Sequence, residues 1–264
     1  MRFKDANAFK ELMGYEVEGS WYPRVTKILE VKAKSGLDQF FKEVGNYGAV
    51  EEIKNRSAEE GTRVHEVIQK HMTGNLPSIP DDMAHVVSAF DSFNQEKGII
   101  FHPDFVERRV WSGIHRFAGT IDALASINGK FGVLDIKTST GFYAEYNLQT
   151  AAYVLALQEP NVKKAIELPR DIETRWILRI DQIKTCTNCG ARLREKGGRM
   201  KIRPASPVRQ EVCEDEVHTW GPVKGEVEMR EFPYYYKDIK AFLAAKSLWE
   251  WENNYWLRTM GYLK

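Results

Sequence analysis

The sequence predicts a single α/β domain of the α+β type, with a mixed central β-sheet and helices on both of its faces. Three observations support this prediction. Predicted helices and strands are interleaved along the chain. An Asn-Gly pair joins two apolar runs, which is the strongest short-range signal of a β-hairpin. A chain of 264 residues can also bury a substantial core. We therefore predict one domain over residues 1–264, with an inserted subdomain over 184–224.

Composition restricts the class of protein more than it identifies a partner. The chain is 43% hydrophobic and 28% charged, as in globular proteins, and its formal net charge of +1 favours no class of partner. No apolar run approaches the roughly 18 residues that a membrane span needs. The N-terminal segment lacks the apolar stretch of a signal peptide. We expect a cytoplasmic protein with no membrane partner.

Hydrophobic periodicity assigns the elements before the hairpin. Ser57 and Glu60 have the spacing of a capping box, which predicts a helix that begins at about residue 58 and ends near 72. Residues 21–45 are expected to form a short turn followed by helical stretches. Three further segments are a loop over 74–80, a helix over 82–98 and a strand over 104–112.

Four elements are expected after the hairpin. They are a helix over 144–159, strands over 173–183 and 225–235, and a closing helix over 237–256. About 40 residues separate the last two strands, which is far longer than an ordinary connection. This length is the reason for predicting an insertion over 184–224.

The Asn-Gly turn at 128–129 sets the register of the hairpin. A two-residue type I′ turn places Ile127 opposite Lys130, and pairing outward from there places Asp122 opposite Asp135. Because side chains alternate between the two faces of a sheet, both aspartates would lie on one face. The prediction depends on the register, since a slip of one residue would send them to opposite faces.

Lys137 would lie on the same face as the two aspartates, opposite Thr120. Two carboxylates on directly opposed positions repel each other, so a proton or a cation is expected between them. Lys137 offsets one charge, and Mg²⁺ or Mn²⁺, which prefer oxygen ligands, would offset more. A simple surface ion pair between Asp135 and Lys137 is the alternative, but it leaves Asp122 unexplained. The opposite face would fill the core with four residues: Ile121, Ala123, Leu134 and Ile136.

Four short motifs occur in the order "GTRVHEVI", "GTIDAL", "VLDIKTS" and "QTAAY". Together they resemble the RecB-like branch of the PD-(D/E)xK nuclease superfamily. In that family the motifs are a helical histidine after a glycine, an aspartate in a G-x-x-D strand, a D/E-x-K strand and a Q-x-x-x-Y helix. The matching residues are Gly61 and His65, Gly119 and Asp122, Asp135 and Lys137, and Gln149 and Tyr153.

The resemblance implies a restriction-endonuclease-like core that hydrolyses DNA phosphodiester bonds with a divalent metal. It implies that His65, Asp122, Asp135 and the backbone carbonyl of Ile136 hold one or two Mg²⁺ or Mn²⁺ ions. It also implies that Lys137 orients or helps to deprotonate the attacking water and stabilises charge on the phosphate.

Three further residues have two interpretations each. Gln149 and Tyr153 are one helical turn apart, so they would contact DNA or brace the site, or else serve in plain helix packing. Glu107 would be an additional metal ligand or a carboxylate beside the ligands, or else form a salt bridge with Arg109.

The insertion contains all three cysteines, and an odd number argues against a disulfide framework. Cys186 and Cys189 form the C-x-x-C of "CTNCG", a common metal knuckle, and Cys213 and His218 are the best candidates for two further ligands. Such a Cys₃His set fits structural Zn²⁺. Some RecB-like nucleases carry a four-cysteine iron–sulfur cluster, but three cysteines inside an insertion depart from that pattern. Three unliganded thiols remain the alternative.

The expected function is a metal-dependent deoxyribonuclease, taken as an exonuclease of recombination, repair or phage DNA processing. Its expected partners are single-stranded DNA or duplex ends, with a helicase or recombination protein as a candidate because the chain has no P-loop. The alternatives are a non-catalytic DNA-binding or scaffold module of the same fold and a structure-specific endonuclease. The basic segment 192–203 is a candidate nucleic-acid contact or a solvated face.

Overall fold

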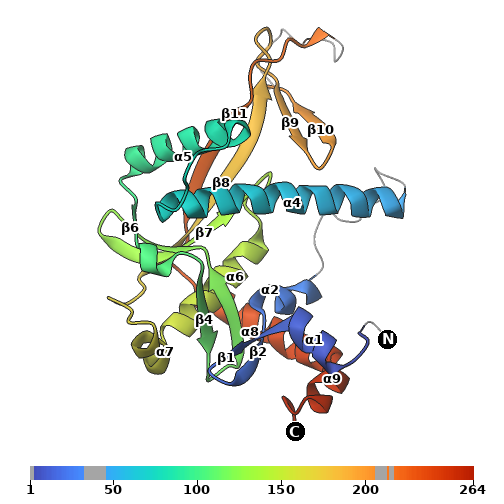
Figure 1. Ribbon diagram of the computed structural model, residues 1–264, viewed down its shortest axis with the longest axis vertical. Coiled ribbons are helices and arrows are strands. Elements are labelled where there is room, and N and C mark those ends of the chain that lie inside the picture. The colour runs from blue at the N-terminus through green and yellow to red at the C-terminus, as the bar shows by residue number, and fades with distance from the viewer. Residues whose placement is uncertain (1–2, 33–45, 206–212, 214–216) are drawn as a thin grey trace.

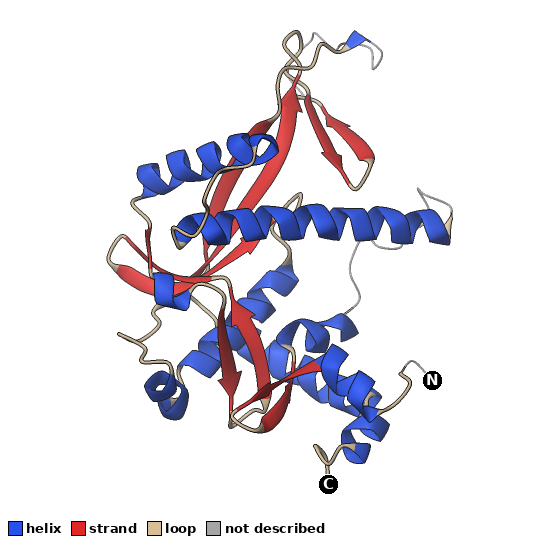
Figure 2. Ribbon diagram, viewed as in Figure 1, coloured by secondary structure: helices blue, strands red, loops and turns tan. Residues whose placement is uncertain are grey.

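The computed structural model describes residues 3–32, 46–205, 213 and 217–264. A central mixed β-sheet carries helices on both faces, which confirms the predicted fold class at this level (Figures 1 and 2). The helices are α1 (Ala6–Met13), α2 (Val25–Ile28), α4 (Tyr47–Met72), α5 (Ala84–Lys97), α6 (Ala144–Leu157), α7 (Pro160–Ala165), α8 (Tyr236–Glu252) and α9 (Asn254–Thr259). Short 3₁₀ turns are η1 (Leu29–Val31), η2 (Asp81–Met83) and η3 (Pro103–Phe105).

Seven strands form the central sheet in the order β10-β9-β8-β7-β6-β3, with β11 paired to β8. The pair β7–β8 is parallel and the other pairs are antiparallel. These strands are β3 (Ile100–Phe101), β6 (Ala123–Ile127), β7 (Lys130–Lys137), β8 (Thr174–Thr185), β9 (Arg192–Lys196), β10 (Arg199–Arg203) and β11 (Lys224–Glu231). Two separate hairpins are β1 (Gly14–Val17) with β2 (Ser20–Pro23) and β4 (Arg108–Ser112) with β5 (Phe117–Ile121).

The β6–β7 hairpin has the predicted register. Asn128 and Gly129 both have left-handed backbones, with φ of 50° and 79°, as a type I′ turn requires. Ile127 pairs with Lys130, and the ladder continues outward through Leu124 and Val133. The local Asn-Gly signal is therefore sufficient to set this pairing.

The predicted pairing fails beyond Ala123, because the strand bends at Asp122. Residues before the bend form β5, which pairs with β4, so Thr120 lies opposite Arg109 and not opposite Lys137. Lys137 instead pairs with Arg179 of β8. Two other strand pairings replace the predicted one: β5 pairs with β4, and the end of β7 pairs with β8. Ile121 consequently packs in a different apolar cluster from Leu134.

Alternation along β7 builds a core on each face of the sheet. Val133 faces a cluster that includes α6 and α8, whereas Leu134 and Ile136 face a cluster that includes α4 and α5. The sheet is thus enclosed between two helical layers. Because β7 is buried on both faces, apolar side chains are expected along it. Asp135, a charged residue that is only 1% exposed, is an exception to this pattern.

Helix α4 begins eleven residues earlier than predicted, at Tyr47. Its N-cap is Asn46, whose Oδ1 accepts hydrogen bonds from the N–H groups of Gly48 and Ala49. The predicted capping box of Ser57 and Glu60 is therefore wrong. Both residues lie inside the helix, and the Glu60 carboxylate binds a backbone N–H of the insertion instead.

Three other predicted boundaries change. The strand predicted over 104–112 begins at Arg108, after η3, and the closing helix breaks at Asn253 into α8 and α9. Residues 21–32 contain the end of the β1–β2 hairpin, α2 and η1, whereas 33–45 lie outside the described residues.

Within the described segments, no helix combines the length and apolar character needed for a membrane span.

The predicted insertion is an extension of the central sheet. Strand β9 pairs with Lys184 and Thr185 at the end of β8, beyond the part that pairs with β7, and β10 follows on β9. Figure 1 shows this hairpin projecting past the main body near α4. Parts of the insertion, 206–212 and 214–216, are outside the described residues.

Candidate active site

The bend at Asp122 brings together three of the predicted site residues. Its Oδ2 accepts a hydrogen bond of 2.6 Å from the backbone N–H of Ile136, on the neighbouring strand. Asp135 and Lys137 lie on either side of Ile136, and the Lys137 Nζ is 2.7 Å from the Asp135 Oδ2. Because the side chain of Ile136 points into the core, the two flanking side chains share the opposite face of β7.

Gln149 links Tyr153 to Asp135. The Nε2 of Gln149 lies 3.2 Å from the Asp135 Oδ1 and 3.0 Å from the Tyr153 hydroxyl, so it can donate to both. Tyr153 is 2% exposed and its ring lies against Gly119. A Cβ atom at Gly119 would come within 2.4 Å of the Tyr153 Cε1, so only glycine leaves room for the ring. These contacts hold Asp135 in place and leave Tyr153 too buried to meet a large ligand.

His65 approaches the site from α4. Its Nδ1 is 4.0 Å from the Asp122 Oδ2. One turn earlier, Gly61 passes close to Thr138, where an added Cβ would lie 2.7 Å from the Thr138 Oγ1. The small residue at position 61 therefore lets the helix approach the end of β7, and this approach brings His65 to the carboxylates.

Glu107 lies next to Asp122. Its N–H donates to the Asp122 carbonyl oxygen at 3.1 Å, and its carboxylate accepts from Gln69, one helical turn after His65. No ion pair within 4.0 Å joins Glu107 to Arg109 among the described residues; the Arg109 guanidinium instead covers the Tyr15 ring. Of the two interpretations, the position of Glu107 favours a carboxylate that belongs to the acidic group.

Burial dominates the electrostatics of the site. It raises the pKa of Asp122 and that of Asp135 to about 6, although Lys137 opposes the rise in both. Burial also lowers the pKa of His65 to about 4, so its imidazole is neutral at neutral pH. For Lys137 burial acts to lower the pKa, but the two aspartates outweigh it and raise the pKa above its usual value. The ammonium is therefore charged.

One oxygen of Asp135 bears on cation binding. The Asp135 Oδ2 is buried and accepts no hydrogen bond from the described residues, although the Lys137 ammonium is near. Carboxylate oxygens and a neutral imidazole nitrogen are donor types that metal cations accept, and here the Lys137 ammonium lies 2.7 Å from the Asp135 Oδ2. His65, Asp122 and Asp135 are nevertheless less compact than a closed metal site: among the described residues, their ligand atoms do not all lie within 4.8 Å of one another.

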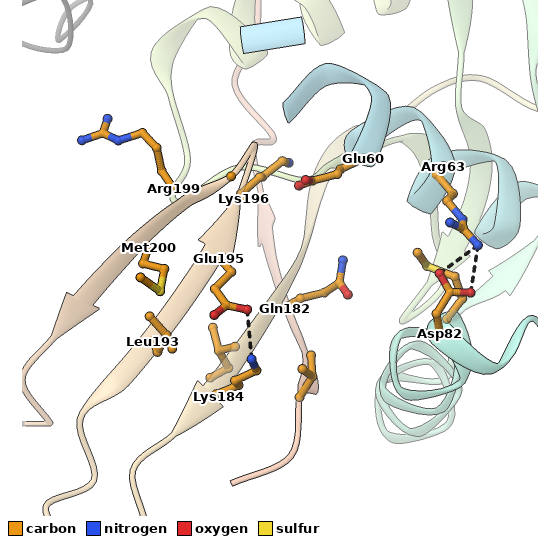
Figure 3. A pocket seen from close by; sticks show the side chains of 14 residues that line it. Glu60, Arg63, Asp82, Gln182, Lys184, Leu193, Glu195, Lys196, Arg199 and Met200 are labelled. Carbon is orange, nitrogen blue, oxygen red and sulfur yellow. Dashed lines mark hydrogen bonds and ion pairs between the residues drawn. The ribbon is translucent and has the colours of Figure 1, made fainter. Parts of the chain in front are cut away.

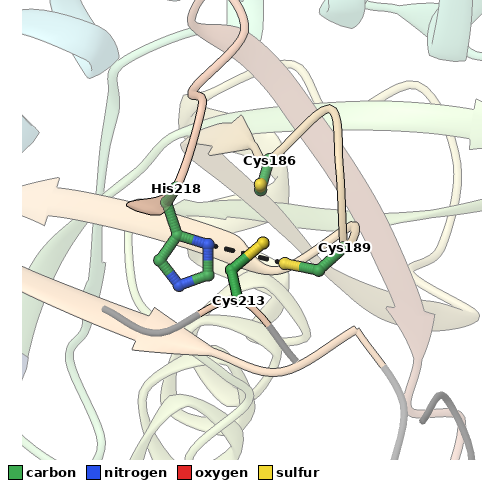
Figure 4. Close-up of side chains that lie close together, drawn as sticks. All are labelled: Cys186, Cys189, Cys213 and His218. Carbon is green, nitrogen blue, oxygen red and sulfur yellow. Dashed lines mark hydrogen bonds between the residues drawn. The ribbon is translucent and has the colours of Figure 1, made fainter. Parts of the chain in front are cut away.

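The second predicted site is compact. The Sγ atoms of Cys186, Cys189 and Cys213 and a ring nitrogen of His218 all lie within 4.8 Å of one another (Figure 4). The Cys189 Sγ is 3.5 Å from the His218 Nδ1 and accepts a hydrogen bond from the Ala191 N–H. This Cys₃His cluster could bind a metal such as Zn²⁺.

The electrostatics of the cluster fit a cation. Backbone N–H groups, chiefly that of Cys189, lower the pKa of the Cys186 thiol to about 6. The neighbouring Cys189 thiol raises the pKa of Cys213 to about 11. The lowered pKa of Cys186 favours its thiolate, which is the form of cysteine that binds zinc.

Two residues near the site were not predicted. The ring of Tyr146 lies 5.1 Å from the Lys137 Nζ. Tyr146 is one helical turn before Gln149, so helical spacing could have indicated that the two residues share a face. Lys196, at the tip of the insertion, donates to the carbonyl and the hydroxyl of Thr138. No local pattern connects Lys196 with Thr138, because the contact depends on how the insertion folds back.

No protein-family model matches the chain, and no curated protein matches it significantly.

Proposed function

We propose that this chain is a divalent-metal-dependent nuclease that hydrolyses DNA phosphodiester bonds on a PD-(D/E)xK-type core. The observation that supports the proposal best is the group formed at the bend. Asp122 and Asp135 meet there with Lys137, and one buried oxygen of Asp135 accepts no hydrogen bond from the described residues. Two carboxylates buried close together are costly even with Lys137 to offset part of their charge, so a site that keeps them is a candidate for cation binding.

Each residue has a role that follows from its chemistry. Asp122, Asp135, His65 and the carbonyl of Ile136 would hold one or two Mg²⁺ or Mn²⁺ ions, which supply Lewis-acid activation of water and phosphate when bound. Lys137, a charged ammonium, would stabilise negative charge that develops on the phosphate. Its raised pKa makes this electrostatic role a better fit than proton abstraction.

The supporting residues keep the site in order. Gln149 and Tyr153 fix one oxygen of Asp135 through the hydrogen bonds already described. Glu107 adds negative charge beside Asp122 and would strengthen the attraction for a cation. We take the Cys₃His cluster to be a structural zinc site, because four protein ligands leave no position open for a substrate.

The substrate that we propose is DNA, as single strands or duplex ends, in recombination, repair or phage DNA processing. Exonucleolytic action rests on the resemblance to RecB-like nucleases. A non-catalytic binding module and a structure-specific endonuclease are the competing functions, and both are accessible to the same assay.

The decisive experiment compares end-labelled and circular DNA, single- and double-stranded, with Mg²⁺ or Mn²⁺. We expect the wild-type protein to degrade linear DNA, and Asp122→Ala and Lys137→Met to lose activity by at least about 100-fold, the scale of removing one electrostatic group. Cleavage of circles would instead assign an endonuclease.

Lys246→Met is the matched control for Lys137→Met. Lys246 is also a buried lysine, 8% exposed, and it is paired with Glu250 on α8. We expect this variant to lose stability but to keep the activity of its folded fraction. Activity that survives Asp122→Ala and Lys137→Met would refute the site, and binding without cleavage of any substrate would support the binding module.

A further inference from the structure

Six cationic side chains line a groove on one face of the extended sheet. The groove has a volume of about 230 Å³ and begins at residues 140–142, directly after the end of β7. We call it the arginine groove. Its cations come from β8, β9, β10 and β11 and are Arg179, Arg192, Arg194, Lys201, Arg203 and Arg230.

The arginine groove continues the face that carries the candidate active site. Strands β7 and β8 are parallel, and Lys137 is the register partner of Arg179. Side chains of paired residues in neighbouring strands point to the same face of a sheet. The cations of the groove therefore lie on the same surface as Lys137, and those of β9 and β10 lie beside the part of β8 that β7 does not reach.

The hairpin places like charges opposite each other. Arg192 pairs with Arg203 and Arg194 pairs with Lys201, directly across the β9–β10 ladder. Opposed like charges destabilise a strand pair, so this arrangement is costly for the hairpin alone. An anionic ligand would offset that cost.

Carboxylates of the protein neutralise only part of this charge. Glu226 pairs with Arg179 and Arg192, and Asp181 pairs with Arg179 and Arg194. The lining contains three carboxylates, those of Asp181, Glu226 and Glu228, against six cations, which leaves three positive charges. Lys201 and Arg203 are exposed and form no ion pair within 4.0 Å among the described residues.

The other face of the same hairpin has a different character. Figure 3 shows Leu193, Glu195 and Met200 around a cavity of about 570 Å³ that also involves α4 and η2. Alternation along β9 and β10 separates these side chains from those of the arginine groove. Four cations also line this cavity, but three carboxylates accompany them: the cations are Arg63, Lys184, Lys196 and Arg199, and the carboxylates are those of Glu60, Asp82 and Glu195. The arginine groove, with six cations and three carboxylates, therefore has the larger excess of positive charge.

We propose that the arginine groove binds the sugar-phosphate backbone of the DNA strand whose scissile phosphate lies at Asp122, Asp135 and Lys137. This inference rests on the proposed nuclease function and extends it, because it assigns the path of the strand beyond the site. Arginine suits the task, since its planar fork donates two hydrogen bonds to one phosphate. Lys201 and Arg203, which pair with no carboxylate of the described residues, contribute most.

The test uses the full chain with zinc retained and no Mg²⁺ or Mn²⁺ added. Binding of a fluorescein-labelled single-stranded oligonucleotide is measured by anisotropy between about 50 and 300 mM salt. The variant is Lys201→Ala with Arg203→Ala. The control is Lys4→Ala with Lys164→Ala, which removes the same charge from two exposed lysines outside the groove.

We expect the groove variant to bind about 10-fold more weakly at the lowest salt and to lose about 1.4 from the slope of log K against log salt, since each single-strand phosphate contact contributes about 0.7. The control keeps the wild-type slope. With Mg²⁺ present, we expect the groove variant to show a raised KM and an unchanged kcat.

The outcomes separate this inference from the proposed function. Equal slopes for wild type and groove variant, or no binding of the oligonucleotide by wild type, would overturn the arginine groove. If cleavage then still depends on Asp122 and Lys137, the nuclease proposal stands alone. A slope that depends on the groove, in a protein that cleaves no DNA, would support the groove and refute the nuclease.

Discussion

The Asp122 carboxylate accepts a hydrogen bond from the backbone N–H of Ile136 at the point where the β6–β7 ladder ends. The Asp122 side chain thus accepts from a backbone N–H of β7 that β5 would have paired with if the ladder had continued. The same contact fixes Asp122 beside Asp135 and Lys137. The fold of the bend and the acidity of the site are therefore coupled, and the coupling can be measured.

Asp122→Asn should stabilise the protein at high pH. Burial raises the pKa of Asp122 from the usual 3.8 to about 6, so the folded state binds this proton more tightly than the unfolded state does. In the wild-type protein the proton on Asp122 therefore favours folding, and this contribution is complete below about pH 4 and is lost as the pH rises through 6. The shift in pKa corresponds to roughly 2–3 kcal/mol of unfolding free energy. Asparagine does not ionise, so the variant does not lose this stability at high pH.

Thermal unfolding without added Mg²⁺ or Mn²⁺ checks this expectation. The advantage of Asp122→Asn in Tm should be largest at pH 8 and should shrink toward pH 4, at about 2–4 °C per kcal/mol. Asp81→Asn, which removes an exposed carboxyl on η2, serves as the control. A Tm advantage for Asp122→Asn that does not change with pH would contradict the raised pKa.

Mn²⁺ should stabilise the wild-type protein at pH 8. A ligand that binds only the folded state at 100 times its Kd adds about 2.7 kcal/mol. Asp122→Asn and Asp135→Asn should lose most of this gain, because each lacks one of the carboxylates. Differential scanning calorimetry measures the shift, and any contribution from the cysteine cluster is the same in all three proteins. Equal shifts would place the Mn²⁺ elsewhere.

Gly119→Ala should displace Tyr153. The added Cβ would lie 2.4 Å from the ring, and overpacking of this kind costs about 1–3 kcal/mol. Urea unfolding should show the loss. Gly141→Ala is the control. A Cβ added there would meet no group of the described residues within 4 Å, so we expect this variant to be as stable as the wild type. In a double-mutant cycle, Tyr153→Leu should recover part of the loss. Simple additivity of the two changes would argue against the contact.

Metal analysis of the purified protein should give about one zinc per chain. Cys189→Ser should lose it, and Asn188→Ala, at an exposed position of the same knuckle, should retain it. Because Cys189 lies just before β9, zinc loss should also loosen the hairpin and make residues 192–203 more sensitive to proteolysis. Iron with visible absorption would contradict the zinc prediction.

Local patterns predicted the parts of the site that lie on single elements. The turn at Asn128 and Gly129 gave the correct register from its first pair to that of Ala123 with Leu134, but the predicted pairing of Asp122 with Asp135 is wrong because the ladder ends one residue earlier. Helical spacing placed Gln149 and Tyr153 on one face of α6. These features depend on φ preferences and on the period of one helix or strand, which the sequence contains directly.

Competition between distant segments could not be predicted in this way. The bend at Asp122 exists because β4 pairs with β5, and no residue at the bend is a proline or a bulge glycine that would announce it. The contact between Glu60 and Gly197 joins residues 137 positions apart. The Glu60 carboxylate accepts hydrogen bonds from the Gly197 N–H, so it does not form the capping box that was predicted with Ser57.

The position of β10 has a consequence for the behaviour of the protein in concentrated solution. Within the described part of the chain, β10 is the outermost strand of the sheet beside β9, and an outermost strand can recruit a strand from another molecule. An antiparallel copy centred on Lys201 would set that residue against itself and Arg199 against Arg203. Such repulsion disfavours edge-to-edge aggregation, so the charges of the hairpin also protect the protein from its own copies.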